Sequence, residues 1–485
     1  NEELAFEEAV RHYERALGVC ELVDDVDLEV RSDLAIGFAV ALDAAGDERR
    51  RAAAFAAADA ARAIPDAERL ARAALVLTRA GGNSSAVLDP DLVALLDEAL
   101  DAIGTDVSPL RARVMSALAA ELAWGPEEER RRRLASEALE LARETRDPEA
   151  LGMALARGWS LIDGSEPFLD ELGAMYREAE EVATAIDNPR LLASVLVGKG
   201  MVAACFGDLP AFEAAVEAQS RIASSLRLPG VAWAAGNGAA ALAAFVGDYA
   251  LAERQTFESV ELGRAADADE TTVMAFIGAV LYQVRMAQGR VGELVEALSN
   301  MVGSAPDVPV WRVALAGALV ESNQVDAARE HYEFLTADDF ARVPRDIEFP
   351  VTMCGLARMT LQIAPPEAVV RAIIERLTPF SGTFNWSGPT ITDPNDLGLA
   401  MAAAVLGDVE VSERLFDAAV DLCERAGARA YLARAHLDRA RARIERGDVA
   451  GAREPAQTAL ALGAELDLSG PHGVVVRAQA ILGLG

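Results

Sequence analysis

Lysine is almost absent from this sequence of 485 residues: Lys199 is the only one, and Gly200 follows it. A phosphate-binding loop of the form G-x-x-x-x-G-K-[ST] is therefore absent, because that loop needs a lysine followed by serine or threonine. The four histidines stand far apart, with no HExxH motif and no Cys/His cluster. We therefore expect no catalytic residues, no metal and no cofactor in this chain.

The four cysteines, Cys20, Cys205, Cys354 and Cys423, have no spacing typical of a metal or redox motif. They fit buried thiols in a reducing compartment, so we expect a cytoplasmic protein.

No run of about 18 apolar residues free of charge occurs, and no basic, apolar and small-residue leader opens the chain. Because an amphipathic helical pattern begins right after Asn1, we expect the chain to be part of a longer protein.

Aromatic residues make up only 5% of the chain and hydrophobic residues 52%, so the apolar surface is mainly alanine, leucine and valine. This composition favours closely packed helices over strands. Asp plus Glu number 77 and Lys plus Arg 45, which gives a net charge of −32. A field of that sign repels phosphate backbones and anionic lipids, so we expect no direct nucleic-acid or membrane partner.

Glycines reveal an internal repeat: Gly158, Gly198, Gly238 and Gly278 are separated by 40 residues each. A fixed period of this length is typical of solenoid proteins. Prolines at expected helix starts follow a similar spacing, and aspartate or asparagine precedes the first two as an expected N-cap. These prolines are Pro148, Pro189, Pro229 and Pro309.

Glycine turns mark the joints between expected helices. Six of them are Gly46, Gly207, Gly247, Gly289, Gly407 and Gly447, and all but Gly289 are followed by aspartate. Glycine ends one helix in the left-handed conformation, and the aspartate caps the next helix. The joints predict about eleven helical hairpins and a final helix over residues 473–482.

Each hairpin is too thin to bury its own apolar face, so neighbouring hairpins must stack into an all-α solenoid with a continuous core. We expect N-terminal hairpins over residues 1–88 and a central array over 89–378. An irregular aromatic loop over 379–394 follows, and C-terminal hairpins with a capping helix complete the chain over 395–485.

Three stretches resemble the second helix of tetratricopeptide (TPR) repeats. They are GDYALAERQTFESVELG, NQVDAAREHYEFL and GDVEVSERLFDAAVDLCERAG. The resemblance implies a right-handed α-solenoid of about eleven TPR-like hairpins, although the period near 40 exceeds the 34 residues of that repeat. HEAT-like stacking is the structural alternative.

The order of segments also resembles the C-terminal helical region of large bacterial signalling ATPases. The resemblance lies within about residues 140–465 and is carried by ALARGWSLI, GDLPAFEAAVEAQSRIASSLRLPGVAW, VWRVALAGALVE, DDFARVPRDIEFPVTMCGLA and LTPFSGTFNWSG. Those proteins join an AAA or STAND-type nucleotidase to such an array, often with a LuxR-type DNA-binding domain or an adenylate-cyclase domain. The resemblance implies a sensor arm whose partners are a protein or small effector and an upstream ATPase domain.

Two glycine pairs mimic a dinucleotide-binding fingerprint, at residues 198–200 and 236–238. Both fall inside expected helices, so close helix packing explains them better than nucleotide binding.

The stretch EEERRRRLASEAL aligns glutamates 127–129 with arginines 131–133 at four-residue spacing. This spacing predicts three surface ion pairs on a solvated helix face.

The residue after each repeat glycine faces the concave groove in a tetratricopeptide register. These residues are Trp159, Lys199, Ala239 and Ala279. Trp159 and Lys199 are therefore candidate contacts for an effector, including an anionic one. The alternative is a partly buried tryptophan and a surface lysine without a binding role.

The stretch PFSGTFNWSGPTITDP, residues 379–394, is longer than a joint between helices requires. Its aromatic side chains need an apolar place to rest, so we expect it to fold back onto the solenoid. It either plugs a gap in the helix stack or forms a lip that contacts the effector. In the second case Phe384, Asn385 and Trp386 are candidate binding residues.

Three functions follow from this architecture. The first is a non-catalytic regulatory or sensor arm of a signal-transduction or transcriptional regulator, which binds a protein or effector on its concave face. The second is the regulatory region of a nucleotide cyclase. The third is a scaffold for self-assembly, with a homo-oligomer as its product.

Overall fold

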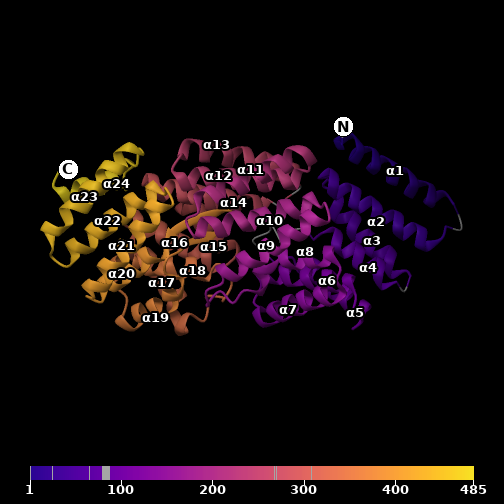
Figure 1. Ribbon diagram of the computed structural model, residues 1–485, viewed down its shortest axis with the longest axis horizontal. Coiled ribbons are helices and arrows are strands. Elements are labelled where there is room, and N and C mark those ends of the chain that lie inside the picture. The colour runs from indigo at the N-terminus through magenta and orange to yellow at the C-terminus, as the bar shows by residue number, and fades with distance from the viewer. Residues whose placement is uncertain are drawn as a thin grey trace.

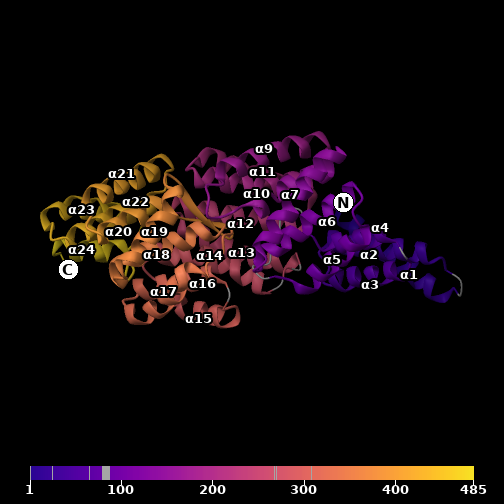
Figure 2. The ribbon, with the colours of Figure 1, turned by 90° about the horizontal axis from the view of Figure 1, so that it is seen from below.

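The chain folds as an all-α solenoid, as its composition and repeat predict (Figure 1). The computed structural model describes residues 2–484, apart from residues 24–25, 65, 79–87, 267, 269 and 307. This part of the chain contains 24 α-helices, four short 3-10 helices and one two-stranded sheet. Figure 2 shows one elongated body with α1 at one end and α24 at the other.

The even-numbered helices form the inner layer, because each of them touches the next even-numbered helix. Their bounds are α2 (Leu28–Ala45), α4 (Ala67–Val76), α6 (Pro109–Glu121), α8 (Pro148–Ala156), α10 (Pro189–Cys205), α12 (Pro229–Val246), α14 (Glu270–Gln288), α16 (Pro309–Glu321), α18 (Phe349–Ile363), α20 (Asn395–Val405), α22 (Arg429–Glu445) and α24 (Val474–Leu482).

The odd-numbered helices cover this layer and bury mainly one face. In α13, Tyr249, Ala252, Thr256, Ser259 and Gly263 are buried, at the steps of three and four residues that define one helical face. The odd-numbered helices are α1 (Glu2–Leu22), α3 (Arg50–Arg62), α5 (Pro90–Ile103), α7 (Glu128–Thr145), α9 (Leu169–Ala185), α11 (Leu209–Leu226), α13 (Tyr249–Ala265), α15 (Val295–Ser304), α17 (Val325–Phe340), α19 (Glu367–Leu377), α21 (Val409–Arg425) and α23 (Val449–Glu465).

The hairpin count agrees with the prediction. Each even-numbered helix from α2 to α22 is followed by its odd-numbered partner, so the described chain contains eleven hairpins, and α24 follows them as the final helix. The N-caps are also confirmed: the Asp147 side chain accepts from Ala150 N, and Asn188 accepts from Leu191 N. All six predicted glycine turns have positive φ, which a residue with a Cβ adopts at a cost.

Two of the repeat glycines show why the period uses glycine. A Cβ at Gly198 in α10 would lie 2.2 Å from Cζ of Tyr176, so a larger residue would push α9 and α10 apart. A Cβ at Gly278 in α14 would meet no atom within 4 Å. Gly198 therefore permits close helix packing, as predicted, whereas Gly278 borders an open space inside the solenoid.

Successive turns of the superhelix touch each other. The Gly164 N–H donates to Arg345 O and the Gly470 N–H donates to Gln288 O, both at 3.0 Å, across 181 and 182 positions. The Arg345 N–H donates to Glu128 Oε1 at 2.9 Å, across 217 positions. These separations fall on both sides of about 200 residues, so about five hairpins of 40 residues complete one superhelical turn.

The arginine-rich stretch of α7 departs from the predicted solvated face. Arg131 is only 2% exposed, and its guanidinium donates to Ser160 O at 2.7 Å and to Ile162 O at 2.9 Å. The first carbonyl belongs to the short 3-10 helix Gly158–Leu161, and the second belongs to the residue after that helix. This 3-10 helix packs on α7. A helical ion-pair pattern could not reveal this, because the acceptors lie in the next hairpin.

One described helix, α12, is long and apolar enough to cross a membrane by length and composition. Of its residues, 44% are buried, and it packs against α10, α11, α13 and α14. A core helix of a helical array has the same length and composition, and α12 occupies that place in the inner layer.

Candidate functional site

Residues 384–394 form a β-hairpin inside the solenoid. Strand β1 (Phe384–Ser387) pairs antiparallel with β2 (Thr390–Pro394), with Trp386 opposite Ile391. Gly388, at φ 55°, supplies the left-handed residue of the tight turn. The segment is thus more regular than the irregular loop we expected, because its glycine and proline lie in the turn and at the strand end.

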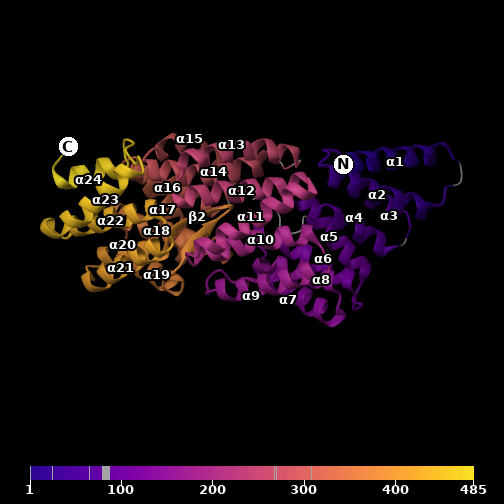
Figure 3. The same cartoon turned by 45° about the horizontal axis from the view of Figure 1, so that its top comes forward.

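The hairpin lies between inner helices that are distant in sequence. Figure 3 shows β2 at the middle of the body, between α12 and α18. Both strands contact α10 and α18, and β2 also touches α12, α14, α20 and α21. The hairpin therefore occupies the interior of the superhelix.

One side of the hairpin is a structural plug. The Phe384 ring is 1% exposed and packs edge-on against Phe245 of α12 and Tyr431 of α22, with centroid distances of 5.2 Å and 5.8 Å. The Tyr431 hydroxyl donates to Ile391 O at 2.7 Å. These contacts connect the hairpin to α12 and α22, which belong to different turns of the superhelix.

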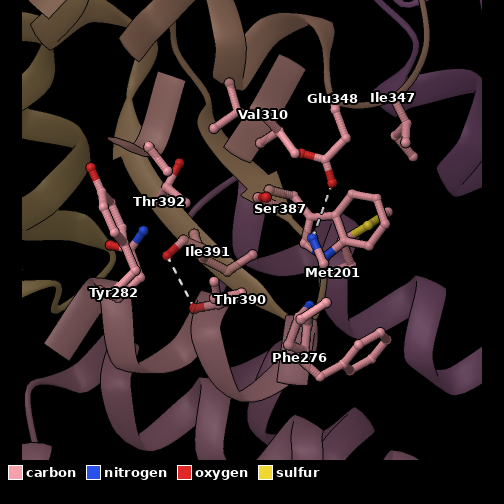
Figure 4. A pocket seen from close by; sticks show the side chains of 18 of the residues that line it. Met201, Phe276, Tyr282, Val310, Ile347, Glu348, Ser387, Thr390, Ile391 and Thr392 are labelled. Carbon is pink, nitrogen blue, oxygen red and sulfur yellow. Dashed lines mark hydrogen bonds between the residues drawn. The ribbon is translucent and has the colours of Figure 1, made fainter. Parts of the chain in front are cut away.

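The other side of the hairpin borders a chamber of about 340 Å³ (Figure 4). The chamber is enclosed by the inner helices α10, α12, α14, α16 and α18, which make up one superhelical turn, and by residues 386–393. Its wall is mostly apolar. The larger aromatic side chains in it are Trp159, Tyr176, Phe212, Phe276, Tyr282, Trp311 and Trp386.

The structure brings together two of the predicted site residues, Trp159 and Trp386, which both line the chamber. Lys199 does not line it, because its ammonium group pairs with Glu180 of α9 at 2.5 Å. Phe384 and Asn385 are buried behind the chamber wall. The Asn385 amide donates to Asp393 O at 2.9 Å and so supports the hairpin.

Both the repeat glycines and the residues after them contribute to the chamber wall. Three of the four repeat glycines line it, Gly198, Gly238 and Gly278, and two of the four residues that follow them do so, Trp159 and Ala279. The small residues among them leave the space that larger side chains would fill.

Glu348, at the start of α18, is the main chamber residue that sequence analysis missed. Its Oε1 accepts from the Gly388 N–H at 3.1 Å, and its carboxyl faces Ser387 in Figure 4. Its Oε2 is buried without a hydrogen bond of good geometry. Burial, together with the nearby carboxylate of Asp346, raises the pKa of Glu348 to about 8. An acid before Phe349 reads from sequence as an ordinary helix start, so no pattern indicated it.

A buried ion cluster closes the C-terminal end of the chamber. Arg358 of α18 pairs with Asp438 of α22 at 2.7 Å and with Asp393 of β2. Glu321 of α16 pairs with Arg434 of α22 at 3.0 Å and with Arg477 of α24. Burial alone would raise the pKa of Glu321, but the two arginines outweigh it and hold the pKa at about 2.

No group of three or more His, Cys, Asp or Glu side chains that could hold a metal occurs among the described residues. Cys354 lines the chamber as a free thiol, and burial raises its pKa to about 12. A thiol with so high a pKa is a poor nucleophile. The chamber wall is mostly apolar and contains a few polar groups.

No protein-family model matches this sequence, and no curated protein matches it. Among solved structures, the chain is similar to one described as the crystal structure of the APC/C hetero-tetramer Cut9-Hcn1, with 15% sequence identity and a TM-score of 0.35. The similarity covers 98% of this chain and 95% of that chain. The fold assignment rests on the helix order and the helix contacts described above.

Proposed function

We propose that this chain is a non-catalytic sensor arm of a larger signal-transduction or transcriptional regulator. In this proposal its effector is a small molecule that binds in the chamber beside the β-hairpin. The observation that carries the proposal is the chamber itself, which lies inside one superhelical turn and has Trp159 and Trp386 in its wall.

The size and lining of the chamber favour a small molecule over a protein segment. Its volume of about 340 Å³ lies near the lower end of the range of small-molecule sites, roughly 300 to 1,000 Å³. Such sites are mostly apolar, with a few polar groups that fix orientation. Glu348 and Ser194 are two of the few polar residues in the chamber wall.

The position of the chamber supports a role in signalling. A ligand there would touch the inner helices of five successive hairpins as well as the β-hairpin, which also contacts α20 and α21. A ligand that binds one arrangement of these elements more tightly than another shifts the population toward it. The resulting change in the arm would then reach an attached output domain, as in a transcriptional regulator or a nucleotide cyclase.

Gly278→Leu tests this proposal. The new side chain would project into open space in the chamber and would fill it without a clash at the Cβ. We expect a small-molecule extract of the cells that naturally contain the protein to raise the melting temperature of the wild-type chain but not that of Gly278→Leu. The matched control is Gly230→Leu on the exposed start of α12, where a Cβ also meets no atom within 4 Å. An equal shift in all three chains would contradict the proposal.

Self-assembly is the second candidate function, and the N-terminal end of the solenoid favours it. Apolar side chains of α1, α2 and the segment between them are exposed there: Val19, Leu22, Val23, Leu28 and Val30. Contiguous exposed apolar side chains are typical of interaction surfaces. The test is the solution mass of the chain and of Leu22→Glu: a concentration-dependent oligomer that the substitution dissociates supports this function, and a monomer at all concentrations contradicts it.

A further inference from the structure

The chamber wall contains one ionisable side chain without an ion-pair partner among the described residues. Of the acidic and basic residues that line it, Glu321, Arg358, Asp393 and Arg434 all take part in the buried ion cluster. Glu348 has no ion-pair partner among the described residues, and it is only 8% exposed. A buried carboxyl in this situation is costly to ionise unless a positive charge joins it.

The surroundings of Glu348 favour a positive ligand group over a negative one. The charged side chain that acts most on Glu348 is Asp346, which is also acidic. The polar groups that face Glu348 are the Gly388 N–H and Ser387, and neither carries a charge. An anionic ligand would therefore add a third acid at this place, whereas a cation would offset the acids already there.

The rest of the wall fits the body of such a ligand. Phe276, Trp311 and Trp386 line the chamber, and the thioether of Met201 lies in the same wall. In the view of Figure 4, Phe276 lies below the carboxyl of Glu348, and Met201 appears between them. Aromatic faces attract organic cations as well as apolar groups, so a carboxyl and several aromatic rings together are typical of amine recognition.

We infer that the chamber binds an organic cation, in which a basic amine pairs with Glu348 and an aromatic or aliphatic body lies against Phe276, Trp311 and Trp386. The inference rests on the proposed function and adds the chemical class of the effector. Glu348 provides the specificity for an amine, because the other charged side chains of the wall are already paired in the buried ion cluster.

Three probes of the same shape test the inference: phenylbutylamine, phenylbutanol and phenylbutyric acid. Titration calorimetry at pH 7 measures their affinities for the wild-type chain and for Glu348→Gln. We expect the amine to bind the wild-type chain at least about tenfold more tightly than the alcohol, and the acid more weakly than both. Glu348→Gln should lower the affinity for the amine about tenfold and that for the alcohol by less than about threefold. The matched control, Glu375→Gln on the exposed face of α19, should change neither.

A second measurement needs no variant. Without a cation beside it, the Glu348 carboxyl has a pKa of about 8 and is mostly protonated at pH 7. Pairing with an ammonium group lowers this pKa, so amine binding should release close to one proton, whereas alcohol binding should release none. Titrations in two buffers with different ionisation enthalpies measure the number of protons.

Equal affinities for the amine and the alcohol, or amine binding without proton release, would overturn the inference. So would a wild-type chain that binds none of the three probes. If the cell extract still stabilises the wild-type chain but not Gly278→Leu, the proposed function stands and only the ligand class is wrong. If the extract also fails, the proposed function fails with it.

Discussion

The ring of Phe384 packs edge-on against the ring of Phe245, with the two centroids 5.2 Å apart. This contact anchors the β-hairpin to the inner helix α12, and its two strands also contact the inner helix α18. The same hairpin presents Trp386 to the chamber. One short segment thus serves both as a plug between helices and as part of the chamber wall, and the contributions of these two sides can be separated by substitution.

Phe384→Ala should destabilise the chain. The ring is 1% exposed, and removal of a fully buried phenylalanine side chain costs about 3 to 5 kcal/mol. Urea unfolding measures this loss. Phe257→Ala, at a site 55% exposed on α13, is the matched control and should change the free energy of unfolding by less than about 0.5 kcal/mol. If Phe384→Ala lowers the free energy of unfolding as little as Phe257→Ala does, the plug contributes no stability.

Trp386→Ala should act mainly on binding. Because the indole is half-buried and lines the chamber, its loss should destabilise the chain less than Phe384→Ala does. Loss of an aromatic anchor in a site typically costs at least about tenfold in affinity, so the affinity for phenylbutylamine should fall by about that factor. Calorimetric titration and urea unfolding of the same samples separate the two effects. Unchanged affinity would remove Trp386 from the site.

Arg358→Met should destabilise the chain through the buried ion cluster. The substitution leaves Asp393 and Asp438 without their shared cation, and breaking a buried pair in this way costs about 3 to 5 kcal/mol. The comparison is Arg221→Met, which removes an exposed pair with Glu217 and should cost less than about 1 kcal/mol. If Arg358→Met costs no more stability than Arg221→Met, Asp393 and Asp438 become protonated in the folded chain at little cost in free energy.

Glu348 should make the stability of the chain depend on pH. Its folded pKa of about 8 lies above the unfolded value of 4.5, so the folded chain holds the proton more tightly. The stabilisation is present at low pH and is lost as pH rises toward 8. Unfolding free energies of the wild-type chain minus those of Glu348→Gln should therefore fall between about pH 5 and pH 9. Asp346 is present in both chains, so its own contribution to the pH dependence largely cancels in this difference. A difference in unfolding free energy that does not change with pH would contradict the raised pKa of Glu348.

The repeat architecture was predictable because its determinants are local. The Asp147 and Asn188 caps and the glycine turns act within a few residues, so spacing alone predicts eleven hairpins and the final helix. The number of hairpins in a superhelical turn was not predictable. It depends on contacts such as Gly164 with Arg345, which arise only once the hairpins have stacked.

The site was predictable only in part, because its residues come from separate hairpins. Trp159 was predicted because it follows a repeat glycine, and Trp386 because it lies in the aromatic stretch 379–394; both line the chamber. Lys199 also follows a repeat glycine, but its side chain reaches Glu180 instead. Glu348 is one of 77 acidic residues, and only its burial beside the hairpin distinguishes it. Repeat position is thus a weaker guide to the chamber wall than burial in the folded chain.

Equilibrium dialysis tests the chamber most directly: the wild-type chain and Gly278→Leu are dialysed against a small-molecule extract of the cells that naturally contain the protein, and mass spectrometry identifies what each chain retains. We expect the wild-type chain to retain a small organic amine in a ratio near one to one, and Gly278→Leu to retain none of it. Retention of the same molecules by both chains, or of none by the wild-type chain, would contradict the claim that the chamber is the effector site.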